Sequence, residues 1–181
     1  MMKLFVAALA LALATVPATA QQADPQNTIY LDTKDGRVTI RLKPDLAPKH
    51  AAQIKALTKQ GFYDGIVFHR VIPGFMAQTG DPTGTGTGGS KLPNIPAEFS
   101  REPFKRGSVG MARSSEPNSA NSQFFICFEG CASLTGQYTL LGEVVSGMDV
   151  VDKVKKGDAA RNGQVTSPDK IVKMQLAADA K

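Results

Sequence analysis

Residues 68–81 read Phe-His-Arg-Val-Ile-Pro-Gly-Phe-Met-Ala-Gln-Thr-Gly-Asp, and two short apolar runs meet here around a Pro-Gly pair. Strand-forming side chains flank Pro73-Gly74, so the stretch predicts two β-strands joined by a turn. On the first strand, alternation points Phe68 and Arg70 to the same face. In sequence, Arg70 is flanked by Phe68 on one side and by Phe75 and Met76 on the other. Two interpretations stay open: a functional cation, or a surface arginine whose stem packs on neighbouring rings.

Outward from this stretch, much of the chain has the period-two alternation of half-buried strands. The runs Thr28–Leu31 and Arg37–Leu42 flank the turn residues Lys34-Asp35-Gly36, which predicts an N-terminal hairpin. The remaining candidate strands are Ile66–Val71, Phe75–Thr79, Ser108–Ala112, Ser122–Phe128, Thr139–Val145 and Ile171–Leu176.

Only two segments have helical periodicity. The first follows Asp45, a potential cap, and is stopped by Gly61. The second runs from about Gly147 to Lys156, with Ser146 at the start of a capping-box spacing. Many strands with only two helices predict an all-β sandwich or barrel, and in a barrel the helices would cover the open ends.

The N-terminus has the layout of a secretory signal peptide. A basic start, Met1–Lys3, precedes the apolar run Leu4–Ala14, and Ala18–Ala20 offers a small-x-small cleavage site. The apolar run is too short for a transmembrane helix. We therefore expect residues 1–20 to be a signal peptide and residues 21–181 to form a single domain.

Charge and hydropathy exclude two classes of partner. The formal net charge of the chain is +5, with no Lys/Arg cluster longer than two residues, so we expect no binding of nucleic acid. No long apolar run follows the predicted signal, so we expect no membrane insertion.

Two cysteines, Cys127 and Cys131, are too few for a disulfide-dense scaffold. A CxxxC pair can cross-link if the chain turns between its members. The sequence favours the alternative, one buried thiol and one thiol in a loop, and leaves the bridge open.

Several familiar chemistries lack their residues. The segment Gly84–Gly89 matches GxGxxG, but Pro82 and Pro93 flank it and no helix opens there, so we predict a flexible surface loop without nucleotide. His50 and His69 have no metal-ligand spacing to another histidine or a cysteine. No nucleophile elbow is present. We expect neither a metal nor an organic cofactor.

A second stretch complements Arg70. Residues 121–127 read Asn-Ser-Gln-Phe-Phe-Ile-Cys, and alternation turns either Phe124 or Phe125 inward. Together the two stretches offer one cation, aromatic and thioether walls and amide groups, but no nucleophile and no strong acid or base. That set suits binding of an apolar ring beside a carbonyl-rich backbone, which is what an X-Pro segment presents.

The chain resembles the cyclophilin-type peptidyl-prolyl cis–trans isomerases. FHRVIPGFMAQTGD, GSVGMAR and NSQFFIC look like the three signature blocks of that family, in its order, and the likeness runs from about Thr28 to Leu176. The resemblance implies a closed eight-stranded antiparallel β-barrel capped by two α-helices. The export signal and the run Leu134–Thr139 look like the bacterial periplasmic branch, which implies a periplasmic isomerase of X-Pro bonds in exported or folding proteins.

The resemblance also implies roles for single residues. Arg70 matches the catalytic arginine of the family, and Gln78 matches the glutamine that orients it and contacts the peptide. The hydrophobic pocket for the proline ring corresponds to Phe75, Met76, Phe125 and Leu134. Ala112 and Arg113 match positions whose backbone lines the substrate groove.

Three positions depart from the pattern of many family members. Arg113 stands where Asn is more frequent, Tyr138 replaces a pocket histidine, and Ser133 replaces a tryptophan that contacts cyclosporin. The resemblance therefore implies binding of proline-containing polypeptides and only weak binding of cyclosporin. We expect a monomer. The alternative function is a non-catalytic proline-peptide binding module or holding chaperone on the same barrel.

Overall fold

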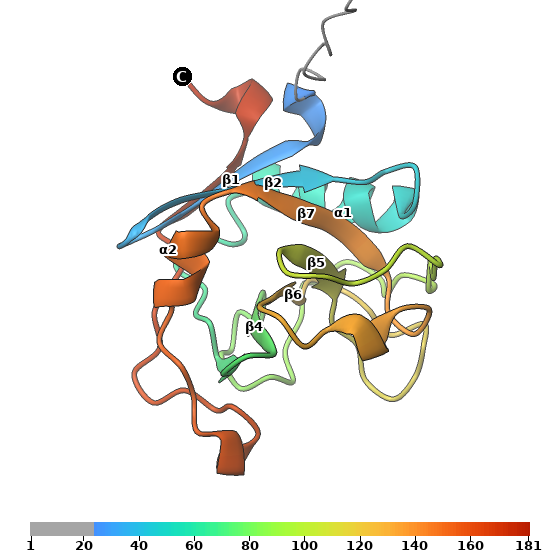
Figure 1. The fold of residues 1–181 in the computed structure, drawn as a ribbon. Coiled ribbons are helices and arrows are strands. Elements are labelled where there is room, and N and C mark those ends of the chain that lie inside the picture. Colours follow the sequence, from blue (N-terminus) through green and yellow to red (C-terminus); the bar gives the residue numbers. More distant parts are fainter. Residues whose placement is uncertain (1–23) are drawn as a thin grey trace, which may run out of the picture.

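The computed structural model describes residues 24–181, which form one curled antiparallel sheet with two helices (Figure 1). The signal peptide predicted for residues 1–20 lies outside the described residues. The strands are β1 (Thr28–Thr33), β2 (Gly36–Leu42), β3 (Arg70–Ile72), β4 (Met76–Thr79), β5 (Ser108–Met111), β6 (Phe124–Cys127), β7 (Leu140–Ser146) and β8 (Lys173–Leu176). The helices are α1 (Pro48–Lys59) and α2 (Met148–Lys153).

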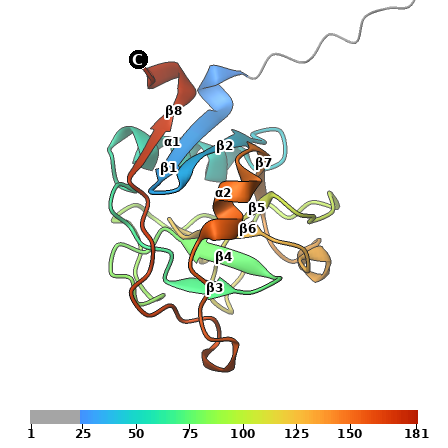
Figure 2. The same ribbon diagram turned by 60° about the vertical axis from the view of Figure 1, so that its left-hand side comes forward.

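The strand order is β3-β4-β6-β5-β7-β2-β1-β8, and every neighbouring pair is antiparallel. Figure 2 shows β3 and β4 at one end of this sheet, with β1 and β8 at the other. The predicted all-β class with two helices is confirmed.

The two ends of the sheet meet through the segments that precede β3 and β8, and there is no continuous ladder between these two strands. The Phe68 N–H donates to the Asp169 carbonyl at 2.9 Å, and the Ile171 N–H donates to the Ile66 carbonyl at 2.9 Å. The strand predicted for residues 66–71 is therefore regular only from Arg70 onward. The free side of β3 bonds to a loop, because the Val71 N–H donates to the Gly163 carbonyl at 2.8 Å. This bond places the loop beside Arg70.

The strands β5 and β6 are buried on both faces, because the sheet separates two apolar clusters. Phe124 belongs to the larger cluster, which includes buried residues of both helices, among them Ile54 and Val151. Phe125 points the other way, into a smaller cluster with Met76 and Phe104. Both phenylalanines of this strand are thus buried, each on its own side.

Neither helix begins with the predicted side-chain cap. The carboxylate of Glu98 accepts hydrogen bonds from the Lys49 and His50 N–H groups at the start of α1, both at 3.1 Å. It thereby satisfies donors that the helix itself leaves free. Helix α2 starts after Gly147, whose φ of +88° suits glycine. That helix ends at Lys153 rather than near Lys156.

Cys127 and Cys131 form a disulfide, with Cα atoms 6.0 Å apart. The preference for two unpaired thiols was therefore wrong. The chain turns at Glu129 and Gly130, whose N–H groups both donate to the Gly74 carbonyl, and this turn brings the two cysteines together. Among residues 24–181, no helix combines the length and the apolar character needed to cross a membrane.

Candidate active site

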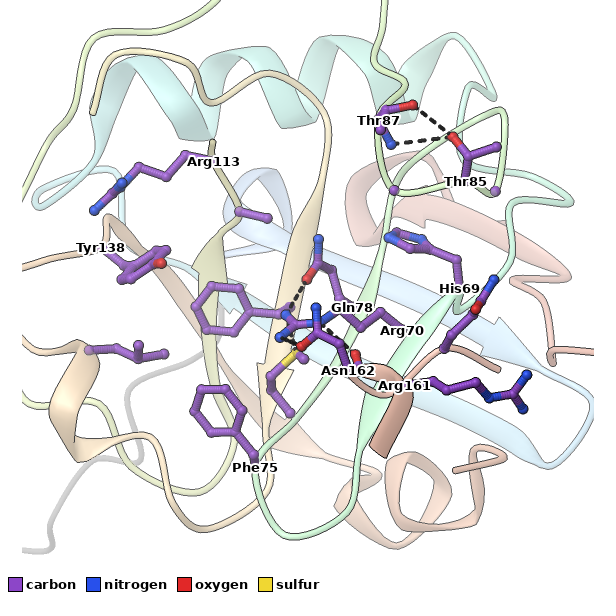
Figure 3. Close-up of a pocket in the computed structure, with 17 residues that line it drawn as sticks. His69, Arg70, Phe75, Gln78, Thr85, Thr87, Arg113, Tyr138, Arg161 and Asn162 are labelled. Atoms are coloured by element: carbon purple, nitrogen blue, oxygen red, sulfur yellow. Dashed lines mark hydrogen bonds between the residues drawn. The ribbon is translucent and has the colours of Figure 1, made fainter. Parts of the chain in front are cut away.

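A cavity of about 630 Å³ lies on the side of the smaller apolar cluster, where β3, β4, β5 and β6 meet the loops around them (Figure 3). All nine residues that the sequence singled out line this one cavity: Arg70, Phe75, Met76, Gln78, Ala112, Arg113, Phe125, Leu134 and Tyr138. They come from four separate parts of the chain. The roles assigned to them remain predictions, but the fold brings the whole set together.

Arg70 lies at the centre of the cavity, and hydrogen bonds fix its guanidinium on three nitrogens (Figure 3). Its Nη1 donates to Gln78 Oε1 at 3.0 Å, which is possible because the two residues are direct cross-strand partners in β3 and β4. Its Nε and Nη2 donate to the backbone oxygen and to Oδ1 of Asn162, at 3.0 and 2.8 Å. Burial lowers the pKa of Arg70, which Tyr138 partly opposes, yet a guanidinium stays protonated in proteins.

The network continues from Gln78 to the glycine-rich loop. Because Gln78 Oε1 accepts from Arg70, its Nε2 is free to donate, and it does so to Gln123 Oε1 at 2.9 Å. Gln123 Nε2 in turn donates to the carbonyls of Gly86 and Gly88 at 3.0 and 2.8 Å. Arg70 is therefore oriented by a row of amides that ends on backbone.

The loop predicted to be flexible is instead tied to one buried carboxylate. Asp81 is 1% exposed and accepts hydrogen bonds from the Thr83 N–H and hydroxyl and from the N–H groups of Gly86 and Gly88. Burial alone would raise the pKa of Asp81, but these donors outweigh it and lower the pKa to about 2. No helix opens in the loop, so the geometry of a phosphate-binding fingerprint is absent from it.

The floor of the cavity is apolar. Met76 and Phe125 are 2% and 4% exposed, and Phe75 and Leu134 are half-buried beside them. The ring of Phe125 stacks on Phe104 with centroids 5.9 Å apart. Gly110 makes this stack possible, since a Cβ there would lie 2.7 Å from the Phe104 ring. A rigid aromatic floor of this kind accepts a small ring but offers no hydrogen bond.

The rim opposite Arg70 consists of Tyr138 and Arg113. The Tyr138 ring meets Phe125 edge to face, with centroids 5.9 Å apart. The guanidinium of Arg113 lies over the Tyr138 ring, 4.5 Å from its centroid, as Figure 3 shows.

Sequence reasoning missed several lining residues, among them His69, Asn162 and Gln164. His69 lines the cavity next to Arg70, whereas Phe68 lies in the larger core, so the predicted pairing of Phe68 with Arg70 on one face was wrong. The irregular backbone before β3 is the reason. Asn162 has a φ of 55°, and the Asn-Gly pair that it begins was a visible turn signal. No local signal indicated the contact of Asn162 with Arg70, which lies 92 positions away in the chain.

The described part of the chain, residues 24–181, holds no group of three or more His, Cys, Asp or Glu side chains that could bind a metal ion. The cavity offers the guanidinium of Arg70, amide groups and an apolar floor, with Arg113 and Arg161 as further cations. This set defines a class of β-sheet proteins in which an apolar pocket lies beside a fixed guanidinium.

Comparison with known proteins identifies the family within that class. Residues 28–176 match the family model described as cyclophilin type peptidyl-prolyl cis-trans isomerase. A probable peptidyl-prolyl cis-trans isomerase from Brucella suis is 60% identical over 174 residues, which cover 90% of this chain and 89% of that protein. A peptidyl-prolyl cis-trans isomerase from Helicobacter pylori is 42% identical over 132 residues, covering 71% and 80% of the two chains.

Solved structures agree with the sequence relatives. A cyclophilin from Hirschia baltica has a TM-score of 0.78 at 26% identity, covering 93% of this chain and 83% of its own. A cyclophilin type isomerase from Cryptosporidium parvum, solved in the presence of the dipeptide Ala-Pro, has a TM-score of 0.75 at 29% identity and covers 82% and 98% of the chains. The chain belongs to the cyclophilin-type peptidyl-prolyl cis–trans isomerases. It is an enzyme of that isomerase class, which confirms the resemblance seen in its three motifs.

Proposed function

We propose that this isomerase catalyses rotation about X-Pro bonds by using Arg70 to stabilise the twisted amide. The observation that carries the proposal is the fixed, half-buried guanidinium beside an apolar floor. Peptide resonance sets a barrier of about 18–20 kcal/mol, and uncatalysed X-Pro isomerisation takes tens to hundreds of seconds. Any group that binds the twisted amide more tightly than the planar one accelerates the reaction.

The donors of Arg70 fit this task. A guanidinium has five N–H groups, and three of them are bonded to Gln78 and Asn162. A fourth, on Nη1, contacts only the weak acceptor Met76 Sδ at 4.0 Å. This N–H group and the second one on Nη2 are the two that can turn to the substrate. When conjugation is lost, the prolyl nitrogen becomes pyramidal and its lone pair can accept a hydrogen bond from one of them. Because the guanidinium is already held in place, little reorganisation is needed at the moment of rotation.

The apolar floor supplies the fixed point of the rotation. With the proline ring held against Phe125, Met76 and Phe75, the carbonyl of the preceding residue is the part that swings. Gln78 holds Arg70 on one side, and the row through Gln123 keeps the Gln78 amide in a single orientation. No bond of the peptide backbone breaks, so the residues present provide what the reaction needs.

The substrates are X-Pro segments of exported, unfolded or partly folded chains in the periplasm. The predicted signal peptide supports this location, and the Cys127–Cys131 disulfide suits an oxidising compartment. The Ala-Pro dipeptide present with the Cryptosporidium parvum relative supports proline peptides as ligands.

A protease-coupled cis–trans assay on a proline tetrapeptide tests the arginine mechanism. Arg70→Lys keeps the charge but lacks the planar fork, so we expect its kcat/KM to fall at least about tenfold. Arg106→Lys is the matched control, because Arg106 is an exposed arginine paired with Asp152. Equal activity of Arg70→Lys and the control would contradict a role for the guanidinium fork.

Cell fractionation tests the location. A mature protein that begins after Ala20 and is released by osmotic shock supports export to the periplasm. Retention of the uncleaved N-terminus in the cytoplasm would contradict it.

A further inference from the structure

Arg113 is held rigidly at the rim of the cavity. Its Nη1 donates to the carbonyls of Ser114 and Ser115 at 2.9 and 3.3 Å, and its Nη2 donates to the Gln137 carbonyl at 3.0 Å. The guanidinium is stacked on Tyr138, and Phe99 lies on it at 5.9 Å. Two of its five N–H groups, on Nε and Nη2, have no acceptor among residues 24–181, and Nε is buried.

The charges that line the cavity are all positive. They belong to Arg70, Arg113 and Arg161, and no Asp or Glu is among the lining residues. Arg161 is neutralised by Asp158, with Nε and Oδ2 3.1 Å apart. Within residues 24–181, neither Arg70 nor Arg113 takes part in an ion pair.

Two carboxylates near the cavity do not neutralise the positive charge of Arg113. Glu116 follows Arg113 by three residues but forms no ion pair with it in the described chain. Asp81 does not line the cavity, and its oxygens accept hydrogen bonds from N–H groups of the glycine-rich loop. Arg113 at the rim therefore presents a positive charge without a carboxylate partner to a ligand in the cavity.

A bound peptide must pass close to this cation. Tyr138 touches the aromatic floor through Phe125, and Arg113 covers Tyr138. A proline ring on the floor is thus one aromatic ring away from the guanidinium. Extended chain advances about 3.3 Å per residue, so a residue next to the proline can bring its side chain to Arg113.

We infer that Arg113 determines substrate specificity by favouring an acidic side chain on a residue flanking the proline. The inference rests on the proposed function and adds a substrate class to it. A carboxylate at that position is attracted by Arg113, which has no carboxylate partner of its own. Because Arg113 is already held by its stack on Tyr138, little side-chain entropy is lost when the two charges meet. The side chain of Arg70 is committed to the prolyl amide, so Arg113 is the charge left for this contact.

The test compares tetrapeptides that differ only in a Glu or Gln next to the proline, placed before it in one pair and after it in the other. For charges about 6 Å apart at an effective dielectric of about 40–80, Coulomb's law gives about a three- to tenfold preference for Glu in kcat/KM. We expect that preference in at least one of the two pairs. We expect added NaCl to reduce it, because salt screens exposed charges.

Variants of Arg113 test whether this residue causes the preference for the Glu peptides. Arg113→Gln is expected to bring the Glu-to-Gln ratio to about one, and Arg113→Lys, which keeps the charge, to retain part of it. Arg101→Gln removes the same charge from an exposed residue that does not line the cavity, so its ratio is expected to stay at the wild-type value.

The outcomes separate the two proposals. No isomerisation of the Gln peptides by the wild-type protein would overturn the proposed function itself. Normal isomerisation of the Gln peptides with a Glu-to-Gln ratio of one in both pairs would overturn only the inference about Arg113. A ratio that survives in Arg113→Gln would also overturn it.

Discussion

Arg70 and Arg113 are both arginines without a carboxylate partner in the described chain, but their surroundings differ. Arg70 is bonded to amide and backbone oxygens, which orient the guanidinium without cancelling its charge. A carboxylate in their place would form a stronger, bidentate pair and occupy the donors that a substrate needs. The amides of Gln78 and Asn162 are neutral, so they hold the Arg70 guanidinium in place and leave its positive charge uncompensated.

Phe125 tests the role of the apolar floor. We expect Phe125→Ala to raise KM several-fold with a smaller fall in kcat, because the ring binds planar and twisted proline alike. Steady-state kinetics on the proline tetrapeptide measure both constants. The control is Phe124→Leu, a change on the opposite face of the same strand. A collapse of kcat with unchanged KM would assign Phe125 to the transition state instead.

Ser133 tests how this protein differs from relatives that carry tryptophan at the position. It is exposed in the short helix η2 (Ala132–Leu134), so a larger side chain there meets solvent rather than the core. Aromatic side chains bury about 150–250 Å² each, at about 25 cal/mol per Å². We therefore expect Ser133→Trp to bind cyclosporin at least about tenfold more tightly.

Titration of cyclosporin against both proteins in the isomerase assay decides this point. The wild-type protein is expected to be inhibited weakly, and the variant to retain its activity on the tetrapeptide. Tight inhibition of the wild-type protein, or no gain in the variant, would show that other residues of the groove set the affinity.

The β3–β4 hairpin and its neighbour β6 build the site. The register pairs Arg70 with Gln78 and Gln78 with Phe125, so three adjacent strands deliver the cation, the amide and the aromatic ring side by side. A shift of one residue in any of these strands would turn its site residue to the other face. The turn at Pro73-Gly74 fixes the register of the hairpin.

The disulfide joins the end of β6 to η2, which carries Leu134 into the cavity. Closure of so short a loop stabilises the fold by about 2 kcal/mol in the chain-entropy account. We expect the double variant Cys127→Ala, Cys131→Ala to lose about that much free energy of unfolding and to show a raised KM. Urea denaturation and tetrapeptide kinetics measure the two effects.

Dithiothreitol provides the matched control for the disulfide. Reduction of the wild-type protein should reproduce the behaviour of the double variant, and the reagent should leave the variant itself unaffected. A wild-type protein whose stability and KM are the same with and without reductant would contradict a structural role for the bridge.

Across residues 24–181, the buried groups His50, His69 and Asp81 make the stability of the fold depend on pH below neutrality. His50 and His69 are 0% and 6% exposed, and burial lowers the pKa of both below the ordinary 6.5, although Glu98 and Asp81 oppose the shift. Near pH 6.5 the two histidines therefore bind protons in the unfolded chain but not in the folded chain. Stability is complete above that pH and falls as the pH drops from 6.5 toward the lower values of the folded state.

Asp81 adds a second stage at lower pH. Its pKa of about 2 lies below the ordinary 3.8, so its contribution is present above pH 4 and is lost as the pH falls toward 2. At about 1.4 kcal/mol per pKa unit, this group contributes about 2–3 kcal/mol. Urea denaturation between pH 2 and pH 8 should show both stages. The variant His50→Asn, His69→Asn should lack the first, and equal stability at pH 7 and pH 5 in the wild-type protein would contradict the prediction.

The sequence predicted the elements of this fold well because their signals are local. Alternation and turn residues placed all eight strands, and periodicity placed both helices. The predictions that failed concern features that depend on residues far away in the chain. Glu98 caps α1 from 49 residues away, and Asn162 bonds Arg70 from 92. The bridge between Cys127 and Cys131 depends on a turn held by Gly74.

The candidate site was predictable to a similar extent. The three motifs contain seven of the nine predicted residues, and Leu134 and Tyr138 come from the run Leu134–Thr139; the fold gathers all nine around one cavity. The motifs did not show the row from Gln78 through Gln123 to the glycine-rich loop, nor the rim on which Arg113 is stacked. Both depend on how separate strands and loops meet in space, which no local pattern encodes.

The proposed mechanism requires Arg70 to bind the twisted amide more tightly than the planar one. The most direct test measures kcat/KM of Arg70→Ala beside its Kd for a proline peptide, with the fold checked by circular dichroism. We predict that kcat/KM falls about 10- to 1000-fold while Kd changes by less than about threefold. Near-native kcat/KM in a folded variant, or a loss of binding as large as the loss of kcat/KM, would contradict stabilisation of the twisted amide by Arg70.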